Sequence, residues 1–221
     1  MKHAKRSGWR PFWAALCAAL LVLLPLAAGL LLWNRLPEQL PMHWNAAGEI
    51  DGWGSRLAGI CLMPLFLLVI HWVCVGACFI DPKNKEQNRK ALGLAIWICP
   101  VVSLLTGYMT LATALGMGLR IEKLVLIFLG LLFIVIGNYL PKCKQNYTIG
   151  IRVMWALDDE ENWTATHRFA SRLWVGFGVV ILLLAFLPWA AAGLWISLGL
   201  TLLASLASVL YSYIFYRKKH G

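Results

Sequence analysis

The sequence predicts an all-α, polytopic membrane protein with six transmembrane helices and both termini in the cytoplasm. Of its 221 residues, 60% are hydrophobic and only 14% are charged. A soluble domain contains about 25% charged residues, so this chain lacks the polar surface that keeps a domain in solution. The charges also form short runs between long apolar segments, which is typical of membrane-flanking charge. The net charge of +10 is therefore interpreted as membrane-related, and no direct nucleic-acid partner is expected.

The first apolar segment, Phe12–Trp33, follows a basic N-terminal stretch. A signal peptide begins in the same way, but this segment is roughly twice the length of a typical signal-peptide core, and no small-residue cleavage site follows it. About 20 apolar residues span a bilayer. We therefore expect a retained transmembrane helix.

Five further apolar segments are long enough to span a bilayer. They are Leu57–Ile80, Ala91–Leu115, Ile121–Leu140, Leu173–Trp189 and Gly193–Tyr216. Pro25, Pro64 and Pro100 lie inside spans, where neighbouring helices tolerate the kinks that we expect. With six spans, 16 of the 20 Lys and Arg residues fall on the side of the N-terminus. The positive-inside rule makes that side cytoplasmic, so the sequence predicts a multi-pass membrane protein with lipids as its first partners.

A few polar side chains lie within the spans. The last span carries a stripe of hydroxyl residues at helical spacing: Ser197, Thr201, Ser205, Ser208 and Ser212. The third span has a weaker stripe of small residues: Ser103, Gly107, Thr110 and Ala114. Small and hydroxyl residues favour close helix packing, so we expect both faces to be buried, with a polar conduit as the alternative. His71 lies near the middle of a span, where a hydrogen-bonded structural role and a proton-relay or ligand role both stay open.

The outer loop Arg35–Arg56 combines extended backbone with turns. Pro37 and Pro41 favour extended conformations in the residues before them, and Asn45–Gly48 and Asp51–Gly52 are turn signals. We expect a compact, hydrogen-bonded cap that could serve as a binding surface. Its candidate recognition residues are His43, Asn45, Gly48 and Asp51. A metal site built on His43, Glu49 and Asp51 would lack a second histidine or a cysteine, so no metal is expected.

The inner loop, residues 141–172, holds most of the distinctive polar residues. Asp158 and Glu161 have capping-box spacing, which predicts a helix that begins at Asp158. Trp163, Thr166, His167, Ala170 and Trp174 then fall on one helix face, whereas Arg168 and Arg172 point elsewhere. This amphipathic helix should run into the fifth span, and its face serves either interfacial packing or docking of a cytoplasmic partner. The candidate residues for these roles are Asn138, Pro141, Lys142, Asn146, Gly150, Arg152, Trp155, Trp163, His167 and Arg168.

The sequence contains none of the motifs that mark common enzymes. The serine-hydrolase elbow, the zinc-protease motif, the Walker loop and the dinucleotide fingerprint are all absent. The six cysteines indicate no disulfide framework, because none lies in the outer loop. We therefore expect a protein that is not an enzyme and has no cofactor.

The two loops resemble the SdpI family of bacterial membrane proteins. The inner match is G-N-Y-x-P-K from Gly137 to Lys142, then N-Y-x-I-G-I-R from Asn146 to Arg152, followed by Trp155, Trp163 and the Thr-His-Arg triplet at residues 166–168. The outer match, L-P-x-x-x-P-x-H-x-N-x-x-G-x-x-D-x-W-x-S-[KR], is similar to an N-terminal module of unknown function that many members carry. The sequence departs from the usual T-P-W-T-L-S at Val153–Asp158.

This resemblance implies two regions: residues 1–90 as a two-helix module with outer loop 35–56, and residues 91–221 as an SdpI-like four-helix region with inner loop 141–172. It also implies immunity against a secreted, membrane-active peptide toxin, and sequestration of a cytoplasmic autorepressor at the membrane. The alternative is a small transporter or channel component that uses a polar path through His71 and the hydroxyl stripes. A membrane enzyme that uses His43 with Asp51, or His167, is a third possibility.

Overall fold

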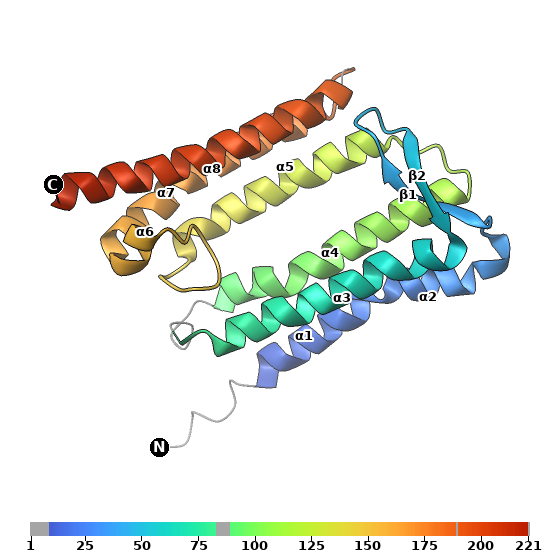
Figure 1. Ribbon diagram of the computed structural model, residues 1–221, viewed down its shortest axis with the longest axis horizontal. Coiled ribbons are helices and arrows are strands. Elements are labelled where there is room, and N and C mark those ends of the chain that lie inside the picture. Colours follow the sequence, from blue (N-terminus) through green and yellow to red (C-terminus); the bar gives the residue numbers. More distant parts are fainter. Residues whose placement is uncertain (1–8, 83–88, 189, 221) are drawn as a thin grey trace. The chain divides into compact units, whose positions relative to one another are not determined.

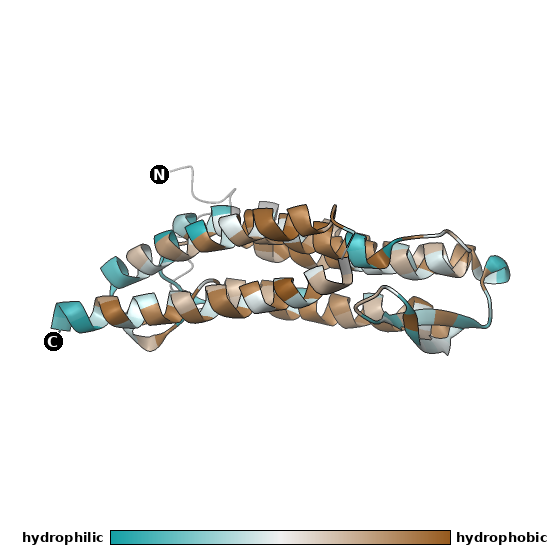
Figure 2. Cartoon of the chain, turned by 90° about the horizontal axis from the view of Figure 1, so that it is seen from above, coloured by the Kyte–Doolittle hydropathy of each residue, from teal (hydrophilic) through white to brown (hydrophobic). Residues whose placement is uncertain are grey.

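The structure is a computed structural model that describes residues 9–82, 89–188 and 190–220 (Figure 1). Within these residues, six helical segments are long and apolar enough to cross a membrane, which confirms the predicted polytopic helical fold. The elements are α1 (Trp9–Val22), α2 (Leu24–Leu31), η1 (Trp33–Arg35), β1 (Gln39–Trp44), β2 (Ile50–Ser55), α3 (Arg56–Ile80), α4 (Arg89–Ala114), α5 (Ile121–Tyr139), η3 (Leu140–Lys142), α6 (Met154–Asp158), α7 (Glu160–Leu184) and α8 (Ala190–His220). Hydrophobic residues fill the middle lengths of the helices, and hydrophilic residues collect towards the ends (Figure 2). The cytoplasmic orientation of the termini stays a prediction.

The chain forms two compact units. Unit 1 comprises Met1–Asn45, Ile50–Phe79 and Leu92–Leu119, and unit 2 comprises Ala46–Glu49, Ile80–Ala91 and Arg120–Gly221. Packing therefore groups α4 with α1–α3. The sequence suggests a boundary near residue 90 between two sequence modules. That boundary stays a prediction.

The first span of unit 1 is interrupted where Pro25 removes a backbone donor. α1 ends at Val22 and α2 begins at Leu24. The hydroxyl of Ser103 on α4 donates to the Val22 carbonyl at 2.7 Å, so a neighbouring helix satisfies a backbone group at the break. One turn further along α4, Gly107 lies directly against the Pro25 ring, where a Cβ atom would overlap it. Pro64 and Pro100, in contrast, lie inside unbroken helices.

His71 has a structural partner inside unit 1. Its side chain is fully buried, and its Nε2 lies 3.0 Å from the carbonyl oxygen of Ala15 on α1. The small residues Ala15 and Ala18 of α1 pack with Val75 of α3 and Ile96 of α4. The hydrogen bond to α1 favours the structural interpretation of His71.

α4 ends in a Schellman motif. Gly116 has φ +78°, its N–H donates to the Thr113 carbonyl, and the Met117 N–H donates to the Ala112 carbonyl. Only glycine adopts this left-handed conformation without strain. This motif ends α4 just before the short connection, residues 116–120, that separates the third and fourth predicted spans.

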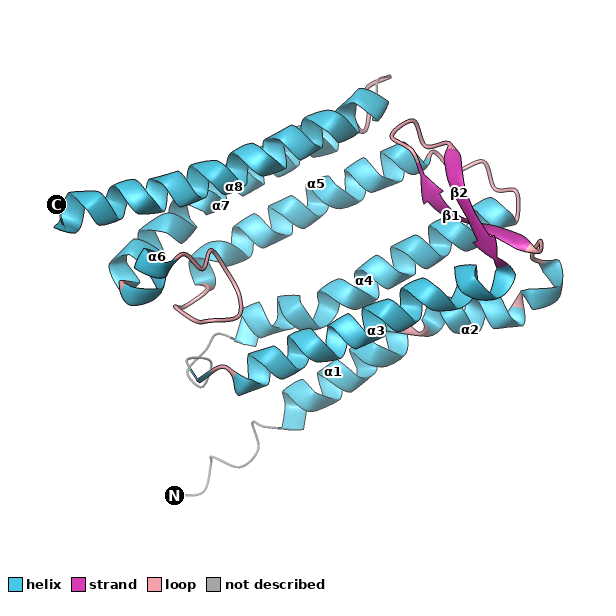
Figure 3. Ribbon diagram, viewed as in Figure 1, coloured by secondary structure: helices cyan, strands magenta, loops and turns pink. Residues whose placement is uncertain are grey.

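The outer loop contains a β-hairpin (Figure 3). β1 and β2 pair antiparallel, from Gln39 opposite Ser55 to Trp44 opposite Ile50, with irregularities on either side of His43. The prolines and turn residues predicted a compact cap, but the strand pairing itself was not predicted. Leu40 is fully buried and packs against Gly59 of α3, where a Cβ would lie 2.7 Å from the Leu40 Cβ atom. The hairpin is thus anchored to α3.

In unit 2, α5 and α7 approach each other through glycines. A Cβ added to Gly178 would lie 2.8 Å from the Gly130 carbonyl oxygen, and one added to Gly130 would lie 2.7 Å from the Leu182 nitrogen. Gly137 approaches the backbone of α7 in the same way. Small residues at such contacts allow backbone-to-backbone packing, which is the main source of helix association in lipid. Leu126, Phe133, Ile181 and Ala185 complete the core between these helices.

α7 is a single helix that includes the predicted amphipathic segment and the fifth span. It ends at Leu184 rather than at residue 189, because Pro188 disfavours helical conformation in the residue before it; Trp189 itself lies outside the described residues. Of the hydroxyl stripe on α8, Ser197, Ser208 and Ser212 are buried, but Ser205 is exposed. The expectation of a wholly buried face was therefore wrong at Ser205.

Candidate functional site

The outer hairpin brings two of the candidate recognition residues together. The Nδ1 of His43 on β1 lies 2.5 Å from the Oδ1 of Asp51 on β2, and both side chains are largely exposed to solvent. Gly52, which faces His43 in the strand register, makes room for this ring, because a Cβ there would lie 2.8 Å from the His43 Cβ. The pair therefore presents a polar surface on a rigid hairpin.

The remaining outer candidates form the turn of the hairpin. Asn45 follows β1, and Gly48 has φ +80°, a conformation that strongly favours glycine. Both residues are half-buried. Asn45 and Gly48 therefore determine the shape of the turn, whereas His43 and Asp51 supply exposed polar groups of the loop.

Arg56 closes the base of the hairpin, a role that the sequence interpretation missed. Its Nε donates to the Pro37 carbonyl at 3.0 Å, and its backbone N–H donates to the Glu38 carbonyl at 2.7 Å. Its guanidinium lies 5.1 Å from the centre of the Trp33 ring, within cation–π range. The sequence signal for this role was the basic residue, Arg56, at the end of the outer motif.

Trp163 and His167 form the buried centre of the inner loop. Trp163 is 1% exposed, donates from Nε1 to the Cys143 carbonyl at 2.8 Å and stacks on the His167 ring. His167 Nδ1 lies 2.8 Å from the Trp163 carbonyl, and its Nε2 accepts the Ile151 N–H at 3.1 Å. These partners define a neutral imidazole that carries its proton on Nδ1.

Gly150 fits against this pair of rings. Its φ is +119°, and a Cβ would overlap His167 Nε2 and lie 3.1 Å from the Trp163 ring. Glycine is therefore required for both conformation and space. The loop cannot close over Trp163 and His167 with a larger residue at this position.

Asn146 organises the loop that precedes Gly150. Its Oδ1 accepts the N–H groups of Thr148 and Ile149, and its Nδ2 donates to the carbonyls of Lys144 and Ile149. The side chain is 1% exposed. Asn146 thus substitutes for regular secondary structure in a segment without a strand or helix, as Asx side chains do in turns.

A second buried network joins α6, α7 and α8. The Asn162 Oδ1 accepts from the hydroxyls of Ser212 and Thr166, and its Nδ2 donates to the Ser212 carbonyl at 3.0 Å. Trp155 Nε1 donates to the Ser212 hydroxyl at 2.9 Å. The sequence analysis named Trp155 and the hydroxyl stripe but missed Asn162, because a single asparagine beside Trp163 carries no periodic signal.

The helix cap differs from the prediction by one residue. Asp158 ends α6, and the N-cap of α7 is Asp159, whose side chain accepts the Glu161 N–H at 2.9 Å. Lys219 of α8 bridges the Asp159 and Glu161 carboxylates at 2.9 and 2.8 Å. The hydrogen bond from Lys219, with those from the backbone, lowers the pKa of Asp159 below its usual value. The short helix α6 displaces the cap from the predicted position.

Another anchor of the inner loop was also missed. The carboxylate of Asp81, in the same compact unit, accepts the Tyr147 N–H at 2.9 Å and the Thr148 hydroxyl at 2.6 Å. Asp81 is 6% exposed. An acidic residue directly after an apolar span was the available signal.

The other inner candidates lie on the surface. Asn138 donates to the Ile134 carbonyl of its own helix, Lys142 lies 5.4 Å from the centre of the Tyr139 ring, and Arg152 donates to the Tyr147 carbonyl at 2.8 Å. These three residues, together with Pro141 and Arg168, are exposed. Exposed cations on an ordered loop can contact anionic groups of lipids or of a protein partner.

The described part of the chain contains no group of three or more His, Cys, Asp or Glu side chains that could hold a metal ion.

In α8, the hydroxyls of Ser197, Thr201 and Ser208 donate to carbonyls of their own helix. Such back-bonding satisfies a hydroxyl within lipid without a partner helix.

Comparison with known proteins gives matches at both loops. Residues 142–212 match the family model described as the SdpI/YfhL protein family, and residues 20–68 match a domain of unknown function, DUF1648. The chain is also 30% identical over 206 residues to the immunity protein SdpI of Bacillus subtilis (strain 168), and this match covers 91% of the chain and 95% of the relative. The chain belongs to the SdpI/YfhL family. No solved structure matches it.

The family assignment confirms the resemblance seen in the sequence and defines the setting of both loops. As a member of the SdpI/YfhL family with six candidate spans, the chain is a multi-pass protein of the bacterial plasma membrane. The SdpI/YfhL match begins at Lys142 and ends at Ser212, so it covers the inner loop and the Asn162 network. The DUF1648 match contains the whole outer hairpin.

Proposed function

We propose that this protein is a non-enzymatic immunity protein that protects the cell against a secreted, membrane-active peptide toxin. The observation that carries the proposal is the 30% identity to the Bacillus subtilis immunity protein SdpI over nearly the full length of both chains. The outer hairpin, with the exposed pair His43 and Asp51, is the proposed recognition surface for the toxin.

The inner loop is the proposed docking surface for a small cytoplasmic repressor. Trp163, His167 and Asn146 are buried, so they position the loop. Lys142, Arg152 and Arg168 are exposed, so they are the groups that a partner would contact. Toxin binding would regulate docking if it favoured one of two arrangements of the helices, since a ligand shifts an equilibrium by its differential affinity for the two states.

Survival of a toxin-sensitive strain that lacks its own immunity protein tests the main proposal. Expression of the intact chain should raise survival, and Asp51→Asn should reduce it, because the amide lacks the negative charge that the carboxylate beside His43 offers to a toxin. Glu38→Gln is the matched control, since it removes the same charge from an exposed site beside the hairpin. Full killing of cells that contain the intact protein at normal membrane abundance would contradict the proposal.

The transporter alternative has less support. It needs polar groups along a path, but His71 is bonded to the Ala15 carbonyl, and most of the stripe hydroxyls on α8 bond within their own helix. Proton flux in proteoliposomes that is lost in His71→Ala would favour this alternative.

A further inference from the structure

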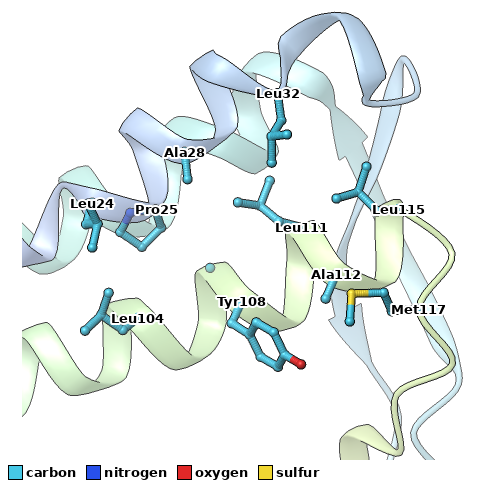
Figure 4. A pocket seen from close by; sticks show the side chains of 11 residues that line it. Leu24, Pro25, Ala28, Leu32, Leu104, Tyr108, Leu111, Ala112, Leu115 and Met117 are labelled. Atoms are coloured by element: carbon cyan, nitrogen blue, oxygen red, sulfur yellow. The ribbon is translucent and has the colours of Figure 1, made fainter.

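Unit 1 contains an apolar groove between α2 and α4 (Figure 4). Its volume is about 330 Å³, within the range of small-molecule sites. The lining is apolar except for the hydroxyl of Tyr108, and the two walls are formed mainly by Leu24, Ala28, Leu32, Leu104, Leu111 and Leu115. These residues belong to, or directly follow, the candidate membrane-crossing segments Pro11–Leu31 and Leu92–Ala114, which places the groove at the depth of the hydrocarbon core.

The groove lies beside the contact between α2 and α4. The two walls are held together where Ser103 bonds to the Val22 carbonyl and where Gly107 contacts Pro25. Beyond this point, α2 and α4 continue towards the hairpin end of unit 1 with the small side chain of Ala28 between them. The apolar groove runs along these two helices next to this contact.

The dimensions and lining of the groove suit a hydrocarbon chain. From Leu24 to Leu32 it runs about 12 Å along the helix, at 1.5 Å per residue, close to the thickness of one hydrocarbon leaflet, about 15 Å. A single extended hydrocarbon chain is narrow enough to enter along this length, and the apolar lining matches its chemistry.

We propose that the groove holds one acyl chain of a membrane phospholipid, with the headgroup at the hairpin end and the chain terminus near Pro25 and Gly107. The bound chain completes the packing between α2 and α4, because an empty apolar space forfeits the dispersion contacts of its lining. The hairpin above the groove then depends on lipid for part of its support. This inference stands apart from the immunity proposal, since it requires no toxin.

Photolabelling in bilayer nanodiscs tests the proposal. The probe is a phosphatidylcholine with a diazirine in the middle of one acyl chain, and adducts are mapped by mass spectrometry of peptides. Peptides with the groove residues of α2 and α4 should carry more label than the lipid-facing surface around Val69 on α3, which is 62% exposed. Ala28→Trp and Leu104→Trp fill the groove from opposite walls, and each should abolish the excess labelling.

Val69→Trp is the matched control, because it adds the same side chain to an exposed position outside the groove. Groove labelling should persist in this variant. Circular dichroism and gel filtration of the loaded nanodiscs show whether each variant keeps its fold. Equal labelling of groove and α3 surface in the intact protein would overturn the proposal, as would groove labelling that survives both fillings. A groove shielded from lipid by a second polypeptide would also overturn it.

Discussion

The glycine contact between α5 and α7 predicts opposite effects of the same substitution at two neighbouring sites. In Gly178→Ala, the new Cβ would lie 2.8 Å from the Gly130 carbonyl oxygen, so α5 and α7 must separate by about 0.7 Å to reach ordinary contact. Overpacking of this kind costs about 1–3 kcal/mol. The higher helix propensity of alanine returns up to ~1 kcal/mol, which leaves a net loss of about 0–2 kcal/mol.

Gly176→Ala is the matched control on the same helix. Nothing lies within 4 Å of a Cβ added there, so only the gain in helix propensity applies, about 1 kcal/mol at most. The two variants should therefore differ by about 1–3 kcal/mol in free energy of unfolding. Thermal unfolding of both variants in the same nanodiscs, monitored by circular dichroism, measures the difference. If the two melting temperatures shifted equally, the close packing of α5 on α7 would be refuted.

Three further changes test the inner loop. Asn162→Leu should destabilise the fold by about 2–4 kcal/mol in chemical unfolding, since it leaves one or two buried hydroxyls without partners, whereas Ser205→Ala, at an exposed hydroxyl, should change stability by less than about 0.5 kcal/mol. The lowered pKa of Asp159, caused chiefly by its hydrogen bond from Lys219, means that the charged cap stabilises the fold fully above the ordinary value of 3.8. That stability should disappear as pH falls through the lowered pKa, and unfolding titrations of Asp159→Asn should lack this acid-dependent step. Gly150→Ala should open the loop and increase proteolysis after Lys144 or Arg152, because φ +119° is strained for alanine and the Cβ overlaps His167; unchanged proteolysis would contradict the packing described for Gly150.

Local chemistry made part of this structure predictable. Runs of about 20 apolar residues indicated the six spans because a bilayer imposes a fixed length. Turn residues indicated a compact outer loop, but the pairing of His43 with Asp51 depends on a strand register interrupted by irregularities, and no short-range pattern specifies it. The cap of α7 was misplaced by one residue because Asp158 has the capping-box spacing to Glu161, whereas the short helix α6 includes Asp158 and leaves Asp159 as the cap.

Long-range contacts were the features that sequence could not provide. The glycines at 130 and 178 matter only because α5 and α7 cross there, and an isolated glycine in an apolar span indicates no partner. The hydroxyl stripe of α8 was recognised as a pattern, yet only Ser212 bonds to other helices, because only this position faces Asn162 and Trp155. Which hydroxyl of the stripe bonds to another helix therefore depends on which position faces the polar side chains of a neighbouring helix.

The motif residues of the inner loop fall into two physical classes, and this division determines how their variants must be interpreted. Trp163 and His167 are almost fully buried and hold the loop against α7, so replacing either one perturbs the fold before it perturbs any partner. Arg152 and Arg168 are exposed, but Arg152 also donates to the Tyr147 carbonyl within the loop. Loss of protection in a Trp163 variant is therefore evidence about folding unless membrane abundance is unchanged, whereas loss in Arg168→Gln at normal abundance identifies a contact with a partner.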